Sequence, residues 1–594
     1  MEALSLIAFD TNHIKEYVFG TNKLKEIRGA SSLLDYLNRL VMGQFAEQYN
    51  AHTVYANGGS GLFSVATKHA KDFGRQVQQA YHNETGGGAS ITFATLSLPD
   101  DVTEDNIDTK DITQFLEELQ WHLQEKKLHP PAFNALASHP FLHPCDACGI
   151  EYASPAVKGK RVIHDPGEED ERYCVSCQFK RVRDHDVKSF IEDIEAGKRV
   201  SYHEYLWDRI IPQLRTMNYT IPPLTERPKD FDTFRNFKGA KDYFGLIYAD
   251  GNNMGRAVRE CKSLPEYKAL ANDIDDALYT AICTAIARHL KIDDHLKSQE
   301  QRTGDLKNDV FPFDILLLGG DDICMLVPAS VALDVALTMA ETFRDEVERK
   351  QHKLTLSVGV VLAPIKYPFG LLQETASTAL KFAKRASANA RAEAKRASAD
   401  ARAEAKKASA GTEVAPTKAS SDDTRINFLI VTGGSSSDFK AVYEATYHKE
   451  DKDDKQDFYA TLRPYAPNDL QTLLNAIRSK DGINLGRTKL HQIREAVLKM
   501  NLKTSVSDGL AVLVSWREKQ RNHVVNNVYE FAGQHQLQRS NPADPVSGFP
   551  RVVFPWFSDG KNKKDYPIYR TSLLDFIELY DFVSREGGDI DEKG

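Results

Sequence analysis

Two adjacent aspartates, Asp321 and Asp322, stand between two apolar runs in "LLLGGDDICMLV". The glycine pair before them supplies the positive φ that a tight turn demands, so the stretch by itself predicts two strands and a turn. Repelling carboxylates at such a tip gain little for stability, but divalent cations would neutralise them. Asp250 ends a second apolar run, "DYFGLIYAD". Oxygen ligands of this kind suit Mg²⁺ or Mn²⁺ shared with a triphosphate, and we predict a site for two such ions.

The stretch directly after Asp250 reads "DGNNMG" and ends at Gly255. Its small residues would let backbone N–H groups face phosphate oxygens at the start of a helix. A lone glycine-rich loop is weak evidence, but its position beside a candidate metal ligand predicts contacts to a nucleotide.

Four cysteines form two pairs with the same spacing, Cys145 with Cys148 and Cys174 with Cys177. Two such knuckles supply four thiolates at tetrahedral positions, which predicts one structural Zn²⁺. A redox motif needs only one such pair, and disulfides are not expected inside a cell. Four thiolates close the coordination sphere, so this metal would not be catalytic.

The elements that must position these residues form two copies of one pattern. Each copy has the order strand, helix, hairpin, helix, strand, and its first strand ends in aspartate. The first copy comprises residues 3–10, 31–49, 52–67, 68–81 and 90–98. The second copy comprises residues 242–250, 264–290, 311–327, 331–350 and 354–364. The first hairpin has no carboxylates. The sequence therefore predicts an α+β fold with two ferredoxin-like palm domains, the first of them degenerate.

Changes in composition divide the chain into four predicted domains. These are a degenerate palm at 1–138, a zinc-binding and helical linker domain at 139–240, a catalytic palm at 241–448 and a helical domain at 449–594. The catalytic palm has a low-complexity insertion at 385–424 with an eleven-residue repeat, "RASANARAEAK" and "RASADARAEAK". We interpret it as a solvated helical extension, with a nucleic-acid-binding arm as the alternative.

The last predicted domain begins with a change in composition. We expect a charged linker at 450–457, amphipathic helices at 467–480 and 487–500, and a disordered tail at 585–594.

The net charge of −8 argues against a protein coated with nucleic acid. No apolar run reaches the length of a bilayer span and no signal peptide is visible, so we expect a cytoplasmic protein without membrane contact.

At these motifs the sequence resembles the polymerase-cyclase large subunit of type III CRISPR effector complexes, and more distantly the GGDEF-type nucleotide cyclases. The similarity extends over most of the chain and includes "KLKEIRGASSLLDYLN", the paired CxxC, "YADGNNMG", "GGDD" and "LSVGVVLAPIKYPFG". It implies conversion of ATP into cyclic or linear oligoadenylate messengers in antiviral defence. Asp250, Asp321 and Asp322 match the metal ligands of the family.

The resemblance also implies contacts to the nucleotide. Ser357 and Gly359 match the motif that approaches adenine, and Lys384 matches the helix lysine that meets phosphates. The full set of predicted nucleotide-binding residues is Gly251, Asn252, Asn253, Gly255, Gly319, Gly320, Ser357, Gly359 and Lys384. The implied partners are ATP or another nucleoside triphosphate, guide RNA with other CRISPR subunits, or a second protomer.

Three departures from the family pattern keep alternatives open. The chain begins with the first palm and not with an HD nuclease domain, so DNA cleavage is not predicted. The histidine that the family often has after the "SVGV" strand is replaced near Ala363-Pro364, so the preference for ATP or GTP stays open. The alanine-rich repeat is an unusual insertion. The alternatives are a non-catalytic scaffold of an RNA-guided complex and a stand-alone nucleotide cyclase.

Overall fold

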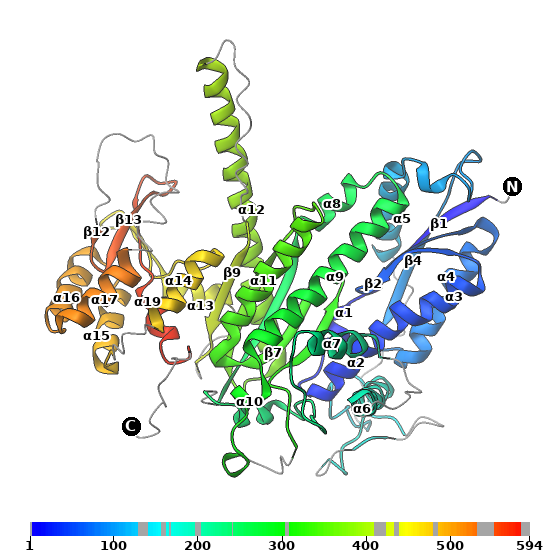
Figure 1. Ribbon diagram of the computed structural model, residues 1–594, viewed down its shortest axis with the longest axis horizontal. Coiled ribbons are helices and arrows are strands. Elements are labelled where there is room, and N and C mark those ends of the chain that lie inside the picture. The colour runs from blue at the N-terminus through cyan, green and yellow to red at the C-terminus, as the bar shows by residue number, and fades with distance from the viewer. Residues whose placement is uncertain are drawn as a thin grey trace.

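The computed structural model describes residues 3–128, 141–155, 162–164, 168–195, 204–239, 242–302, 308–408, 423–432, 439–478, 485–530 and 552–583. Over these residues the protein has three β-sheets with helices packed around them, which confirms the predicted α+β class. The two palm-like sheets and the C-terminal part follow one another across Figure 1 from the blue to the orange end of the chain. None of the described helices combines the length and the apolar character that crossing a bilayer requires.

The first sheet has the strand order β2-β3-β1-β4, and all its neighbouring strands are antiparallel. Its strands are β1 (Leu4–Asn12), β2 (His52–Asn57), β3 (Ser60–Ala66) and β4 (Ser90–Ser97). The helices are α1 (Ile14–Phe19), α2 (Leu24–Tyr36), the π-helical turn η1 (Leu37–Val41), α3 (Met42–Gln48), α4 (Thr67–Thr85) and α5 (Thr113–Leu128). Phe9 and Phe63 of the sheet contact Phe73 of α4 with ring centroids 5.3 and 5.2 Å apart, which fixes this helix on the sheet.

The second sheet has the order β6-β7-β5-β8-β9, with β9 parallel to β8 at the edge and the other pairs antiparallel. Its strands are β5 (Tyr243–Asn252), β6 (Asp314–Gly319), β7 (Asp322–Pro328), β8 (Thr355–Pro364) and β9 (Arg425–Ile430). The main helices are α8 (Met254–Glu260), α9 (Leu264–His289), α11 (Ala332–Arg349) and α12 (Phe369–Ala408). Because its first four strands repeat the order of the first sheet, the predicted pair of ferredoxin-like palms is confirmed.

Both faces of the second sheet are covered, which explains the almost continuous apolar sequence of its central strands. A Cβ on Gly245 would lie 2.5 Å from the Cβ of Ala332 in α11. A Cβ on Gly359 would lie 2.6 Å from the backbone oxygen of Ala376 in α12. Gly245 pairs with Leu362, three positions from Gly359 on the same strand, so the two glycines face opposite sides. Hence α11 covers one face and α12 the other.

Between the two palms lie helices α6 (Val175–Glu195) and α7 (Tyr205–Thr216). Helix α6 crosses α2 so closely that a Cβ on Gly29 would lie 1.8 Å from the backbone oxygen of Lys180. The buried Arg28 donates to Asp184 of α6 at 2.8 Å and to Asp314 of β6 at 3.1 Å. One guanidinium group therefore joins the first palm, the linker and the second palm.

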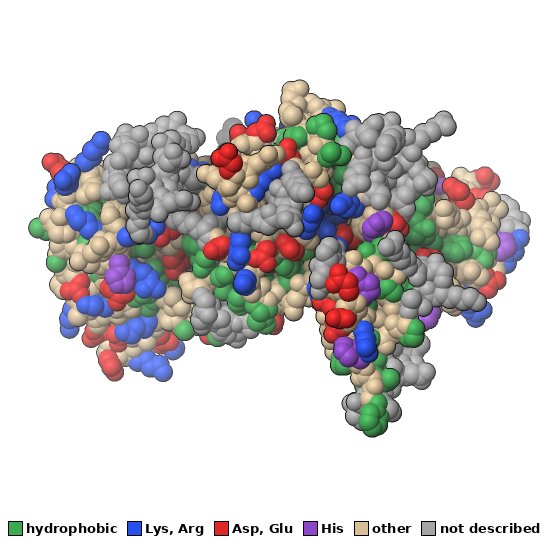
Figure 2. Space-filling view, turned by 90° about the horizontal axis from the view of Figure 1, so that it is seen from below, with side chains coloured by type: hydrophobic (Ala, Val, Ile, Leu, Met, Phe, Trp, Pro, Cys, Tyr) green, Lys and Arg blue, Asp and Glu red, His purple; other side chains and the backbone are tan. Residues whose placement is uncertain are grey.

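Helix α12 begins against the second sheet and then projects away from the rest of the molecule (Figure 1). The predicted helical extension over the repeat is thereby confirmed, while residues 409–422 lie outside the described part. On the face shown in Figure 2, acidic and basic side chains of the described residues are intermingled. This mixture agrees with the small net charge of the chain.

The C-terminal part contains the predicted helices, as α14 (Pro467–Ile477) and α15 (Arg487–Leu498), together with α13 (Phe439–Tyr447), α16 (Leu502–Val514), α17 (Glu518–Val524) and α19 (Leu573–Leu579). The structure adds a sheet of order β10-β11-β14-β13-β12, which the sequence analysis did not predict. Its strands are β10 (His448–Asp451), β11 (Gln456–Tyr459), β12 (Val552–Val553), β13 (Trp556–Lys561) and β14 (Pro567–Arg570).

The predicted charged linker at 450–457 is wrong, because these residues belong to the β10–β11 hairpin. The Asp451 carboxylate accepts hydrogen bonds from the backbone N–H groups of Asp453 and Asp454, both at 3.1 Å, and so closes the turn. Phe458 of β11 is fully buried. The charges of this stretch are therefore those of a hairpin tip. The predicted disordered tail at 585–594 lies outside the described residues.

Candidate metal and nucleotide site

The structure brings the three predicted metal ligands to one edge of the second palm. Asp250 near the end of β5 is directly opposite Asp322 at the start of β7. Directly paired residues on neighbouring strands point to the same face, so these two carboxylates lie side by side. Asp321 is the second residue of the two-residue turn between β6 and β7. The three segments thus meet as the sequence predicts, while their role as metal ligands stays a prediction.

Asp321 and Asp322 lie half-buried beside Asp250, and this destabilises the charged forms of these two side chains. Burial, followed by the charge of Asp250, raises the pKa of Asp321 to about 8 and that of Asp322 to about 6. The Oδ1 atom of Asp322 is buried and has no hydrogen-bond partner within the described part of the chain. Carboxylates that repel one another around an unsatisfied oxygen fit a divalent cation, which would supply both the missing partner and the missing charge.

The cysteines and the aspartates are two different kinds of candidate metal site. Among the described residues, the four cysteines are the one cluster of metal-ligating side chains whose ligand atoms all lie within 4.8 Å of one another. Mg²⁺ commonly binds through one or two carboxylates plus substrate phosphates.

Two lysines from different parts of the chain approach this group. Lys384 of α12 forms an ion pair with Asp250. The Nζ atom of Lys15, in α1 of the first palm, lies 4.9 Å from the ring centroid of Tyr248, and its charge favours the ionised form of Asp322. Burial and then the charge of Asp322 raise the pKa of the Tyr248 hydroxyl, which is itself buried without a partner among the described residues.

Lys15 and Tyr248 were not predicted as site residues. Lys15 follows a strand of the other palm and is an ordinary exposed lysine in the sequence. Tyr248 is part of an apolar strand. Only the packing of the two palms reveals their position, so no local motif could have found them.

The residues after Asp250 have other partners than the predicted phosphate. Gly251 and Asn252 still belong to β5, and the Gly251 N–H donates to the backbone oxygen of Asp321 at 3.2 Å. The buried Asn252 amide donates to Thr355 at 3.0 Å. The following helix, α8, has only seven residues. The structure thus shows how Gly251 ties the turn to β5.

Asn253 and Gly255 lie just beyond the strand. Asn253 has a left-handed backbone with φ of 69°, and Gly255 is exposed. Asparagine is one of the residue types that tolerate this conformation. A contact of either residue to a nucleotide stays a prediction.

The two predicted adenine-contacting residues are held by packing. Ser357 is fully buried, lies opposite Asp250 in the sheet and donates to the Asn252 side chain at 2.9 Å. Gly359 is required because the backbone of α12 passes too close for a side chain. Both residues therefore have a structural role, whether or not a base approaches them.

The predicted glycines of the hairpin pack against the first palm. Gly320 has φ of 64°, as its place in the turn requires. A Cβ on Gly319 would lie 3.0 Å from the Cα of Gly58, in the turn of the first palm. The two turns therefore meet backbone to backbone.

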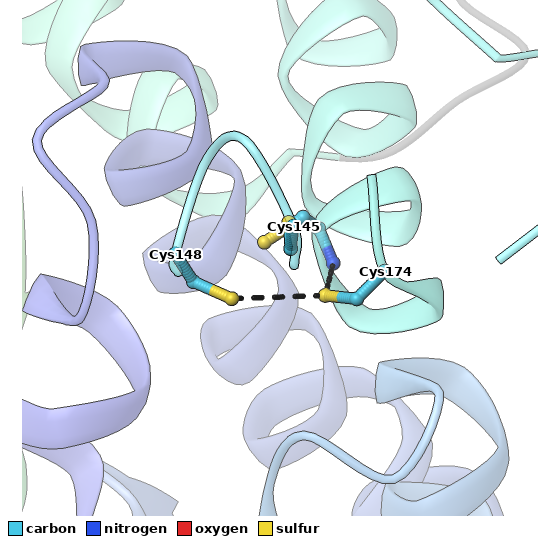
Figure 3. Close-up of side chains that lie close together, drawn as sticks. Cys145, Cys148 and Cys174 are labelled. Carbon is cyan, nitrogen blue, oxygen red and sulfur yellow. Dashed lines mark hydrogen bonds between the residues drawn. The ribbon is translucent and has the colours of Figure 1, made fainter. Parts of the chain in front are cut away.

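The four cysteines converge as predicted. Figure 3 shows the sulfurs of Cys148 and Cys174 pointing toward one another from a loop and from the start of α6, 3.9 Å apart. The backbone N–H of Cys177 donates to the Cys174 sulfur at 3.4 Å, an arrangement common around metal-bound thiolates. Cys145 is buried, and its sulfur belongs to the same compact cluster. This donor set and its compactness fit a tetrahedral zinc ion.

Comparison with known proteins supports the resemblance seen in the sequence. Residues 243–392 match the family model described as Cas10/Cmr2, second palm domain. No curated protein matches the chain. Among solved structures, Csm1 of T. onnurineus is similar with 14% identity and a TM-score of 0.48, over 99% of this chain and 70% of Csm1.

Two crystal structures of a Csm1-Csm4 cassette, one in complex with cA4 and one with one ATP, are similar with 14% identity and TM-scores of 0.39 and 0.41. The match with cA4 covers 64% of this chain and 53% of the other, so the chain spans about half the length of that protein. The similarity to the Cas10/Cmr2 family therefore rests on the second palm, over residues 243–392.

Proposed function

We propose that the chain is a metal-dependent nucleotidyltransferase that joins nucleoside triphosphates, ATP foremost, into cyclic or linear oligoadenylates for antiviral signalling. One observation carries the proposal. In a segment that matches the second palm of the Cas10/Cmr2 family, three half-buried aspartates meet. One of their oxygens, Oδ1 of Asp322, is buried without a hydrogen-bond partner among the described residues. Such a group is costly unless a cation occupies it.

In the proposed reaction, Asp250, Asp321 and Asp322 hold two Mg²⁺ or Mn²⁺ ions. When bound, these ions lower the pKa of the attacking 3′-hydroxyl and stabilise the leaving pyrophosphate. The β5–β7 pairing fixes two of the carboxylates on one face, and the turn fixes the third. Lys384 exchanges its ion pair with Asp250 for a contact to a phosphate.

We propose a supporting role for several residues that match the nucleotide-binding motifs. Gly251, Asn252, Ser357 and Gly359 are all engaged in contacts within the second palm. They keep β5, β8 and α12 in place under the site. Direct contacts to the nucleotide are proposed for Lys384, which pairs with Asp250, and for Asn253 and Gly255, which follow Asp250 in the chain. The family match also supports guide RNA and other CRISPR subunits as partners.

The decisive experiment is mass spectrometry of the products made from ATP or GTP with Mn²⁺, with and without guide and target RNA. The test variant is Asp321→Ala with Asp322→Ala. The matched control is Asp453→Ala with Asp454→Ala, another adjacent pair in a hairpin turn but exposed and far along the chain.

We expect oligoadenylates from wild type and the control variant only. Equal products from the test variant would remove these aspartates from the reaction. No product from wild type under any condition would favour the scaffold, and a product from GTP alone would favour a cyclase with another nucleobase.

We further propose that Cys145, Cys148, Cys174 and Cys177 hold one structural Zn²⁺ at the start of α6. Elemental analysis should find one zinc per chain, and Cys148→Ser should lose it. Since α6 packs against α2, loss of zinc should lower the melting temperature of the whole chain and not only that of the knuckle.

A further inference from the structure

The turns of the two palms press directly on each other. An ideal Cβ on Gly58 would lie 2.3 Å from the backbone nitrogen and 2.4 Å from the Cα of Gly320. We infer that the Gly58–Gly59 turn of the first palm positions the Gly320–Asp321 turn of the second, with Gly58 and Asn38 as positioning residues. This inference rests on the proposed function and names a residue set outside the second palm that this function needs.

The turn of the first palm is itself held firmly. The Asn38 side chain accepts a hydrogen bond from the Gly59 N–H and donates to the Ser60 backbone oxygen at 3.3 Å. The Gly59 oxygen accepts from the Thr11 N–H at 2.7 Å. Asn38 is buried, at 1% exposure, in the π-helical turn η1. Such turns interrupt a helix and recur at functional positions.

The turn of the second palm is clamped from the other side. The backbone oxygen of Asp321 accepts from the Gly251 N–H, one residue after Asp250. The Gly320–Asp321 turn is thus held between β5 and the first palm. No side chain separates Gly58 from Gly320, so a displacement of one backbone cannot be absorbed by a rotamer change. Any shift would move Asp321 and Asp322 relative to Asp250.

A methyl group at Gly58 tests this contact. Gly58→Ala would force the turns apart, since the clash is with backbone atoms. The matched control is Gly560→Ala, because Gly560 also has positive φ, at 80° against 59° for Gly58, but has no atom within 4 Å of its ideal Cβ. Both variants carry the left-handed strain of alanine, and only the first carries the contact.

The measurement is the affinity for Mn²⁺ alone, by electron paramagnetic resonance of the full chain. We expect Gly58→Ala to bind about tenfold more weakly or worse, as for residues that orient metal ligands, and Gly560→Ala to stay within about twofold of wild type. Asn38→Leu removes both hydrogen bonds to the first turn and should weaken Mn²⁺ binding in the same way. Asn38→Asp keeps the hydrogen-bond acceptor, so its affinity for Mn²⁺ should fall less.

Hydrogen exchange of the peptide covering residues 316–327 separates this inference from the proposed function. If wild type fails to bind Mn²⁺ or to make product, the proposed function fails. Faster exchange at the Gly320–Ile323 amides in Gly58→Ala, but not in Gly560→Ala, would still support positioning by the first palm. Exchange and Mn²⁺ affinity equal to wild type in Gly58→Ala would overturn it.

Discussion

The two palms carry the same ion pair at the same place but differ in the hairpin beside it. Lys127 of α5 pairs with Asp10 of β1, and Lys384 of α12 pairs with Asp250 of β5. In each palm the lysine comes from the helix that follows the fourth strand of the motif. Since the pair occurs even where no hairpin carboxylates exist, it is a feature of the fold. The chemical difference lies in the two turns.

The two turns also differ in backbone conformation. In the first palm both central residues, Gly58 and Gly59, have positive φ, at 59° and 83°. In the second palm only Gly320 does, so a residue with a side chain can follow it, and Asp321 does. Asp10 faces Ser60 where Asp250 faces Asp322. Turn type and one paired position thus distinguish the site from its degenerate copy.

The largest effect is expected from the aspartate that both palms share. Asp250→Asn should lower product formation by more than about a hundredfold, because it removes one of the proposed metal ligands. Asp10→Asn should leave the rate within about twofold, since its hairpin has no carboxylates. The rates are measured by quantifying oligonucleotide product at saturating ATP. Equal losses in the two variants would show that the pair matters for folding and not for chemistry.

A smaller effect is expected from the two lysines. Lys384→Met should raise the KM for ATP about tenfold, because the proposed phosphate contact is a charge-assisted hydrogen bond. Lys127→Met should leave KM unchanged, and partly exposed ion pairs of this kind contribute little to stability. Steady-state kinetics of both variants compare the two positions directly. An unchanged KM for Lys384→Met would reduce this lysine to its role in the fold.

The melting temperature of wild type should fall more with rising pH than that of a variant without the two hairpin carboxylates. The pKa values of Asp321 and Asp322 are raised to about 8 and about 6, so folding favours their protonated forms. Their contribution to stability is present at low pH and is lost as pH rises through these two values. Between pH 5.5 and 8.5 in EDTA, wild type should lose about 2–4 °C more than Asp321→Asn with Asp322→Asn.

Mn²⁺ provides the check on that difference. It should restore the melting temperature of wild type at pH 8.5 and have little effect on the double variant, because binding requires ionised carboxylates. The corresponding hairpin residues of the first palm, Gly59 and Ser60, do not ionise. They therefore do not contribute to the pH dependence of the melting temperature in wild type or in the double variant. Parallel curves for wild type and the double variant would mean that folding does not raise the pKa values of Asp321 and Asp322.

Much of this comparison could be predicted from sequence. The alternating strand and helix patterns predict both palms, and the aspartate that ends the first strand predicts their equivalence. The contact between Gly58 and Gly320 could not be predicted, because it joins positions far apart in sequence and involves no side chain. The position of Lys15 near Asp322 could not be predicted for the same reason, because the two residues are far apart in sequence. The sheet of the C-terminal part was missed because its strands are short and one hairpin is dominated by charge.

The smallest effect is expected when a carboxylate is added to the first palm. Ser60→Asp would place a carboxylate opposite Asp10, as Asp322 stands opposite Asp250. A third carboxylate at Gly59 would be strained, because φ is strongly positive there and a Cβ would lie 2.3 Å from the end of the Ile14 side chain. With two carboxylates and no third from the turn, the first palm should not bind Mn²⁺. In a background of Asp321→Ala with Asp322→Ala, Ser60→Asp should therefore restore no Mn²⁺ binding in calorimetry. If binding were restored, the turn conformation would not be what separates the two palms.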